Sequence, residues 1–129
     1  MASAQGLQPD RAQMEQLMEL QTRAMEMRQH VTRLANQIAN LERDQAVARI
    51  TINHIQSLPP GTQTYRPLGK CFTLDSPEAL KDRLSSATQK QALEIQSKTT
   101  LREQFFVKLK ENERQLEDLM DTIERGAGK

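Results

Sequence analysis

The 129-residue sequence contains few side chains whose types and spacing could support catalysis or metal binding. Its two histidines, His30 and His54, have no cysteine or carboxylate at ligand spacing, so we expect solvated side chains and no metal. The thiol of Cys71, the single cysteine, could act as a nucleophile or redox sensor, although small apolar packing is the commoner role. Because the sequence also lacks a glycine-rich phosphate loop and a nucleophile elbow, we expect no enzyme, no catalytic residue and no cofactor.

Composition and charge exclude further classes of function. Hydrophobic residues make up 36% of the sequence, and with one Tyr, three Phe and no Trp a large private core is not expected. Eighteen basic and seventeen acidic residues give a net charge of +1, which provides no excess for binding nucleic acid or an anionic membrane. The lone cysteine, the absence of a signal-peptide pattern and the absence of a long apolar stretch predict a cytoplasmic or nuclear protein.

Glycine and proline divide the sequence into two long helix-forming segments. Neither residue type occurs between Asp10 and Leu58 or between Glu78 and Arg125, and each segment would form a helix about 70 Å long at 1.5 Å per residue. We expect one domain over residues 1–129. Its parts are a first helix at 10–58, a proline-rich corner and hairpin at 59–75, a second helix at 76–125 and a tail at 126–129.

Capping residues mark the starts of both helices. Asp10 and Gln13 have the spacing of a capping box. The second helix has two alternatives: Ser76 as the cap with a proline at the first helical position, or Asp75 as the cap with Glu78 at the third. Arg125 followed by a glycine predicts the end of this helix.

A heptad pattern predicts that the two helices pack together as a coiled coil. In the first helix, steps of three and four residues connect Leu17, Leu20, Ala24, Met27, Val31, Leu34, Ile38, Leu41, Gln45, Ala48, Ile52 and Ile55. Gln45 is the one polar interruption, and we expect it to set the register. In the second helix the pattern is clear at Leu80, Leu84 and Ala87 and again from Phe105 to Ile123. Connecting Leu101 to Phe105 requires a stutter.

The short connection between the helices favours an antiparallel arrangement. A link of about twenty residues allows two helices of equal length to fold back on each other. The expected register places Leu17 near Leu119 and Leu20 near Leu116. The predicted fold class is therefore mainly α: a long antiparallel two-helix coiled coil with a short β-hairpin at its midpoint.

The residues around Gly69-Lys70 predict that hairpin. With Gly69 first in a two-residue turn, type II′ is accessible, Leu68 faces Cys71, and one face holds Tyr65, Pro67, Phe72 and Leu74. Pro67 cannot donate to a ladder, so it should lie at a sheet edge or bulge. An isolated hairpin is marginally stable and no other strand is predicted, so its edges should pair with other chains. The expected interface residues are Tyr65, Leu68, Gly69, Cys71, Phe72 and Leu74.

This arrangement resembles the beta-type subunits of prefoldin, most closely those of the eukaryotic subunit 1 type. The resemblance covers nearly the whole chain, and the segment Tyr65-Arg66-Pro67-Leu68-Gly69-Lys70-Cys71-Phe72 carries it, followed by Ser76 and the second helix. In that family a tyrosine, a glycine and an aromatic residue recur at the positions of Tyr65, Gly69 and Phe72. The sequence departs from the pattern at Pro67, which stands inside a strand, and at Cys71, where a larger apolar residue is common.

The resemblance implies a hexamer of two alpha-type and four beta-type subunits, in which the hairpins merge into β-barrels. Such a hexamer holds unfolded polypeptides such as actin and tubulin without ATP and delivers them to the cytosolic group II chaperonin. The implied partners of this chain are two alpha-type and three further beta-type subunits, unfolded clients and the chaperonin, with no nucleic acid and no membrane.

The helix ends remote from the hairpin offer apolar side chains that suit client binding. Methionine is unbranched and polarizable, which helps a surface to accept many apolar sequences. The expected client-contact residues are Leu7, Met14, Leu17, Met18, Leu116, Leu119, Met120 and Ile123. Seam packing is the alternative role for the leucines, whereas the methionines should be exposed. The alternative function is a structural coiled-coil scaffold or tether subunit without holdase activity, in which the midpoint is only an elbow.

Overall fold

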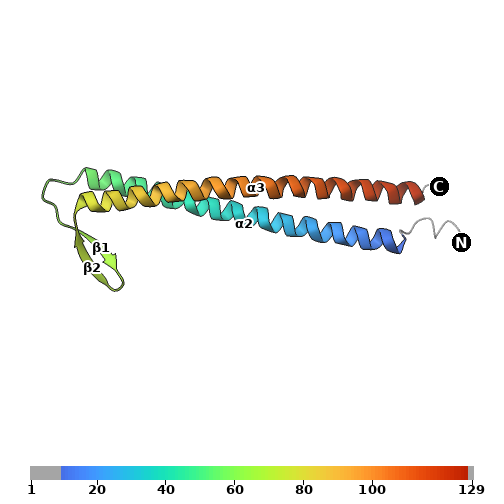
Figure 1. The fold of residues 1–129 in the computed structure, drawn as a ribbon, viewed down its shortest axis with the longest axis horizontal. Helices are drawn as coiled ribbons and strands as arrows, with labels where there is room; N and C mark the ends of the chain where they lie inside the picture. The colour runs from blue at the N-terminus through green and yellow to red at the C-terminus, as the bar shows by residue number, and fades with distance from the viewer. Residues whose placement is uncertain (1–9, 128–129) are drawn as a thin grey trace. The chain divides into compact units, whose positions relative to one another are not determined.

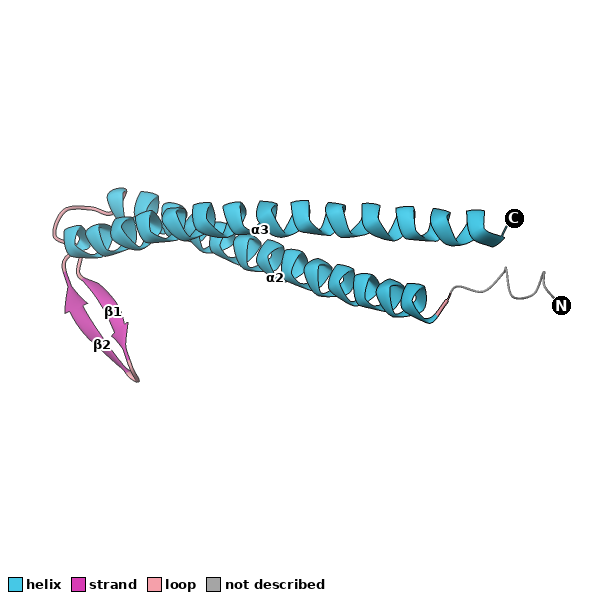
Figure 2. Cartoon of the chain, turned by 45° about the vertical axis from the view of Figure 1, so that its right-hand side comes forward, coloured by secondary structure: helices cyan, strands magenta, loops and turns pink. Residues whose placement is uncertain are grey.

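The computed structural model describes residues 10–127, which form two long helices joined by a two-stranded sheet (Figure 1). Helix α2 spans Arg11–Gln56 and helix α3 spans Pro77–Ala127, with strands β1 at Thr64–Leu68 and β2 at Cys71–Asp75 between them. Figure 2 separates these helices and strands by colour. The predicted mainly α fold with a midpoint hairpin is confirmed.

Contacts divide the chain into two compact units. Unit 1 combines Met1–Ala35 with Thr100–Lys129, and unit 2 comprises Asn36–Thr99. Each unit therefore contains one segment of α2 and one segment of α3, and unit 2 also contains the hairpin.

Helix α2 begins with the predicted capping box. The backbone amide of Gln13 donates to Oδ1 of Asp10 at 2.7 Å, and the amide of Asp10 donates to Oε1 of Gln13 at 3.1 Å. These two bonds satisfy amides that have no partner within the first turn of a helix.

Helix α3 begins with Ser76 as its cap. The amide of Ala79 donates to Oγ of Ser76 at 3.1 Å, and Pro77 is the first helical residue, where its missing N–H has no cost. The alternative cap, Asp75, ends β2 instead. The helix also continues through Gly126 to Ala127, so the predicted stop is early by a residue or two.

In unit 1 the segments of α2 and α3 are antiparallel. Nη2 of Arg28 lies 3.4 Å from Oε1 of Glu113, and the ring of His30 stacks on that of Phe105 with 4.6 Å between centroids. The residue number therefore rises along one helix as it falls along the other. His30 is half-buried in this contact, which corrects the expectation that it is solvated, whereas His54 is exposed.

In unit 2 polar contacts join the two segments, which are antiparallel as well. Gln45 is buried, and its Nε2 donates to the backbone carbonyl of Thr88 at 3.1 Å. Nζ of Lys98 donates to Oε1 of Gln37 at 2.9 Å. Gln45 thus packs inside the seam, as predicted for a residue that sets the register.

The seam of α2 follows the prediction at every position, since each of the twelve predicted residues is buried or half-buried. The buried hydrophobic residues of the described chain are Leu20, Ala24, Leu34, Ile38, Ala48, Leu109 and Leu119. Leucine, isoleucine and alanine make up this set, as expected for the narrow line of contact of a coiled coil.

The seam of α3 differs from the prediction in the position of the stutter. Leu101 is exposed, whereas Arg102 is half-buried. The heptad spacing of seam positions therefore continues without a stutter at this point, with a polar residue in the seam. The extra four-residue step lies instead between Leu84 and Thr88, because Thr88 is half-buried and Ala87 is exposed. Long polar side chains can occupy seam positions because their stems are apolar.

Candidate functional site

The hairpin has the register and turn that the sequence predicts. Leu68 pairs with Cys71, Pro67 with Phe72, and Tyr65 with Leu74. Gly69 has a φ of 61°, and no residue other than glycine has a positive φ within the described chain. A positive φ at the first turn residue alone is the signature of a type II′ turn.

One face of this hairpin is apolar and uncovered. Alternation along the paired strands places four side chains on that face, Tyr65, Pro67, Phe72 and Leu74. The three large ones are between 55% and 74% exposed, and Leu68 and Cys71 are exposed beside the turn. The sheet has two strands only, so within the described residues both of its edges lack a neighbouring strand.

The opposite face of the hairpin carries Leu68 and Cys71 beside the turn, and its polar remainder is tied to the start of α3. Oδ2 of Asp75 lies 3.4 Å from Nε of Arg66 and 3.8 Å from Nε of Arg83. Thr64 also donates its hydroxyl to the backbone carbonyl of Asp75. The ion pairs hold this face toward α3 and leave the apolar face free.

The two edges of the hairpin are not equivalent. Leu68 and Cys71 flank a two-residue turn and form a hydrogen-bonded pair, so the next pair, Pro67 and Phe72, is not hydrogen-bonded and its backbone groups point outward. The missing N–H of Pro67 therefore lies on the outer edge of β1, as expected for an edge position. On β2 the outward amides of Phe72 and Leu74 are both present. The β2 edge is thus the better template for another strand.

Unit 1 has a second exposed apolar surface. Four methionines are between 48% and 61% exposed, and we call them the methionine surface: Met14, Met18, Met25 and Met120. Three of them were predicted as exposed client-contact residues, which the structure confirms as to exposure. Met25 was not predicted, although it lies one heptad after Met18.

The four methionines lie on the same side of unit 1 as the ion pair between Arg28 and Glu113. Met14 lies two heptads before Arg28, and Met120 lies one heptad after Glu113. Residues separated by whole heptads lie on the same side of a coiled-coil helix. The other two methionines are three or four residues from Met14 or Arg28 and so flank the same side.

The predicted apolar partners of the methionines belong to the seam. Leu119 is buried, and three residues are half-buried: Leu17, Leu116 and Ile123. Gln16 and Leu119 line one shallow hollow, in agreement with the predicted register. Leu7 lies outside the described residues. Among the described residues that were predicted to contact clients, the methionines are therefore the exposed ones.

The described residues contain neither a cluster of metal ligands nor a helix that could span a membrane. Among them, no group of three or more His, Cys, Asp or Glu side chains is arranged to hold a metal ion. Neither of the two described helices contains a stretch long and apolar enough to cross a membrane. Cys71 is exposed and forms no disulfide.

Comparison with known proteins identifies the family. Residues 18–125 match the protein family described as Prefoldin subunit. The chain belongs to the prefoldin subunit family. It is 26% identical to prefoldin subunit 1 of Arabidopsis thaliana over 111 residues, which cover 86% of this chain and 87% of that protein. It is 29% identical to the probable prefoldin subunit 1 of Dictyostelium discoideum over 79 residues, which cover 61% and 69%.

The prefoldin match includes the hairpin and three of the four residues of the methionine surface, Met18, Met25 and Met120. Phe106 is a further exposed side chain that the sequence interpretation missed. Counting two heptads back from Met120 leads to Phe106, so the heptad pattern contained the signal. The sequence interpretation placed Phe105 in the seam, where it is half-buried, and gave Phe106 no role.

Proposed function

We propose that this chain is one subunit of a hexameric, ATP-independent co-chaperone that holds unfolded polypeptides and delivers them to the cytosolic chaperonin. Its partners would be two alpha-type and three further beta-type prefoldin subunits, and its clients would be of the actin and tubulin class. In this proposal the whole chain acts as one prefoldin-like domain in the cytoplasm, without a catalytic step or a cofactor.

The observation that carries the proposal is the uncovered apolar face of the hairpin in a member of the prefoldin family. Its aromatic and leucine side chains stand in water although hydrophobic burial favours covering them. A two-stranded sheet with a free β2 edge can gain both ladder hydrogen bonds and apolar burial by pairing with another subunit. The names of the two relatives, prefoldin subunit 1, support assembly of this kind.

The methionine surface supports the client-binding part of the proposal. Exposed methionine side chains adapt their shape to varied apolar partners, and they belong to unit 1, whereas the hairpin belongs to unit 2. Loss of methionine should therefore weaken client binding without affecting assembly.

The test is the joint substitution Met14→Ser, Met18→Ser and Met120→Ser in a reconstituted complex. Light scattering measures how much the complex suppresses the aggregation of a chemically denatured client diluted into buffer. We expect intact assembly and reduced suppression, because three exposed apolar side chains are lost. The matched control is Val47→Ser with Ile50→Ser, which removes exposed apolar side chains of α2 in unit 2.

Equal suppression by the triple variant and the control would contradict the assignment of client binding to the methionine surface. Complete absence of suppression by the unaltered complex would favour the alternative, a scaffold or tether subunit without holdase activity.

A further inference from the structure

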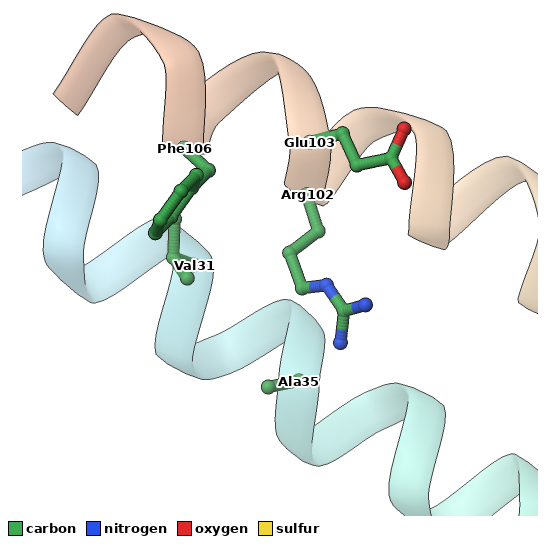
Figure 3. Close-up of a pocket in the computed structure, with 5 residues that line it drawn as sticks. All are labelled: Val31, Ala35, Arg102, Glu103 and Phe106. Atoms are coloured by element: carbon green, nitrogen blue, oxygen red, sulfur yellow. The ribbon is translucent and has the colours of Figure 1, made fainter. Parts of the chain in front are cut away.

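Unit 1 contains a groove between α2 and α3 beside the seam, and the seam residue Val31 forms part of its lining. Its volume is about 390 Å³, and its lining is mostly apolar. Val31 and Ala35 come from α2, and Arg102, Glu103 and Phe106 come from α3. Figure 3 shows the ring of Phe106 standing over Val31, while the side chain of Arg102 extends from α3 toward α2 near Ala35.

The groove continues the side of unit 1 that carries the methionine surface. Ala35 lies one heptad after Arg28, and Phe106 lies one heptad before Glu113, the two residues whose ion pair marks that side. Phe106 is 47% exposed, so part of its ring is available to a ligand.

Two cations frame the apolar wall of this groove. Arg102 is half-buried, and within the described residues its guanidinium has no hydrogen-bond or ion-pair partner. Nζ of Lys110 lies 5.2 Å from the centroid of the Phe106 ring, one helical turn further along α3. The carboxylate of Glu103 points away from the guanidinium in Figure 3. The lining thus contains one cation and one carboxylate, and the unpaired guanidinium of Arg102 is the charge that extends toward α2 beside the apolar surface.

We propose that this groove binds a segment of an unfolded client in which a large apolar side chain stands next to carboxylates. The apolar side chain would pack against the ring of Phe106 and the side chains of Val31 and Ala35. A neighbouring Asp or Glu would accept charge-assisted hydrogen bonds from the guanidinium of Arg102, whose planar donors match a carboxylate. Lys110 would attract a second carboxylate beyond the ring.

The inference rests on the proposed function, because it names one class of client segment, but it uses residues other than the methionine surface. A groove of this volume lies at the lower end of ligand-site volumes, which suits one side chain with its neighbours rather than a folded partner. The charge of Arg102 would favour apolar client segments that carry a carboxylate over those that do not. The methionine surface, which is uncharged, would not distinguish the two.

The test measures binding of a short fluorescein-labelled peptide, with one phenylalanine flanked by glutamates on both sides, to the full chain by fluorescence anisotropy. A second peptide carries lysines in place of the glutamates. We expect the glutamate peptide to bind more tightly, and Arg102→Gln to weaken its binding roughly tenfold or more, the range for a hydrogen bond to a charged group. Phe106→Ser should weaken binding of both peptides.

The matched control is Arg49→Gln, which removes the same charge from an exposed position of α2 in unit 2. Circular dichroism confirms that each variant keeps its helices. The reversal Arg102→Glu should shift the preference toward the lysine peptide, an outcome that misfolding does not produce.

Equal binding of the two peptides, or equal losses for Arg102→Gln and Arg49→Gln, would overturn the inference. Failure of the inference and failure of the proposed function are separable. If the complex suppresses client aggregation but the chain does not distinguish the two peptides, only the proposal for the groove is contradicted. If the chain binds the glutamate peptide selectively but the complex does not suppress aggregation, the proposed holdase function is contradicted. The groove is then still supported as a peptide-binding site.

Discussion

Replacing Phe72 with alanine should exclude this chain from the prefoldin complex. Phe72 is 74% exposed on the apolar face of the hairpin, the largest exposed fraction among the large hydrophobic side chains of the described residues. An aromatic side chain contributes roughly 200 Å² of surface, so covering the exposed part of Phe72 removes about 150 Å² from water. At about 25 cal/mol per Å² this burial stabilises the assembled state by about 4 kcal/mol.

Alanine keeps the Cβ, so we expect a loss of about 3 kcal/mol, or a factor of roughly a hundred in subunit affinity. The assay is competition: isotopically labelled Phe72→Ala and unlabelled unaltered chain are mixed in equal amounts with limiting partner subunits. Native mass spectrometry then counts the chain present in each complex. The variant should occupy on the order of 1% of the complexes.

The matched control is Leu93→Ala, because Leu93 is 66% exposed and belongs to unit 2 but lies on α3 outside the hairpin. It should compete equally with the unaltered chain. Equal incorporation of Phe72→Ala would refute the reasoning, since an uncovered hairpin face would then not be the surface buried on assembly.

Three other substitutions test the supporting contacts. Gln45→Ala should lower the free energy of unfolding by about 1 kcal/mol through loss of its hydrogen bond across the seam, measured by thermal denaturation; an unchanged stability would show that this bond contributes nothing. Asp75→Asn should lower the protection of hairpin amides from hydrogen exchange by about 1 kcal/mol, while Glu15→Gln, in an exposed ion pair, should change little; equal effects would contradict the role of the half-buried pairs. Leu74→Pro should keep the hairpin and block assembly, whereas Thr73→Pro should disrupt both, and an assembled Leu74→Pro complex would contradict the assignment of the β2 edge.

Local signals in the sequence predicted most of the fold because the responsible interactions are local. The capping box at Asp10 and Gln13 and the turn at Gly69 each depend on a few neighbouring residues, and both have the predicted geometry. The heptads of α2 were equally informative, since their apolar residues are interrupted only by Gln45.

The sequence left a choice open, or placed a feature wrongly, where competing partners decide between two local solutions. Ser76 and Asp75 both suit a helix cap, and Asp75 instead pairs with Arg66 and Arg83, which a sequence pattern does not place nearby. The position of the stutter depended on the packing of α3 against α2, because apolar Leu101 is exposed while polar residues fill the seam.

The candidate surfaces were only partly predictable for the same reason. Heptad spacing alone does not tell which apolar residues the seam covers, so Leu119 was expected at the client surface although it is buried. The groove at Phe106 depends on an unpaired guanidinium next to an aromatic ring, and Arg102 lies between Leu101 and Phe105, where a stutter was predicted.

The most direct test of the central claim is the native mass of this chain, alone and then mixed with an alpha-type prefoldin subunit and the other beta-type subunits. Assembly through the hairpin predicts a defined complex of six subunits that contains this chain. A chain that stays a monomer or homodimer with every candidate partner would contradict the account.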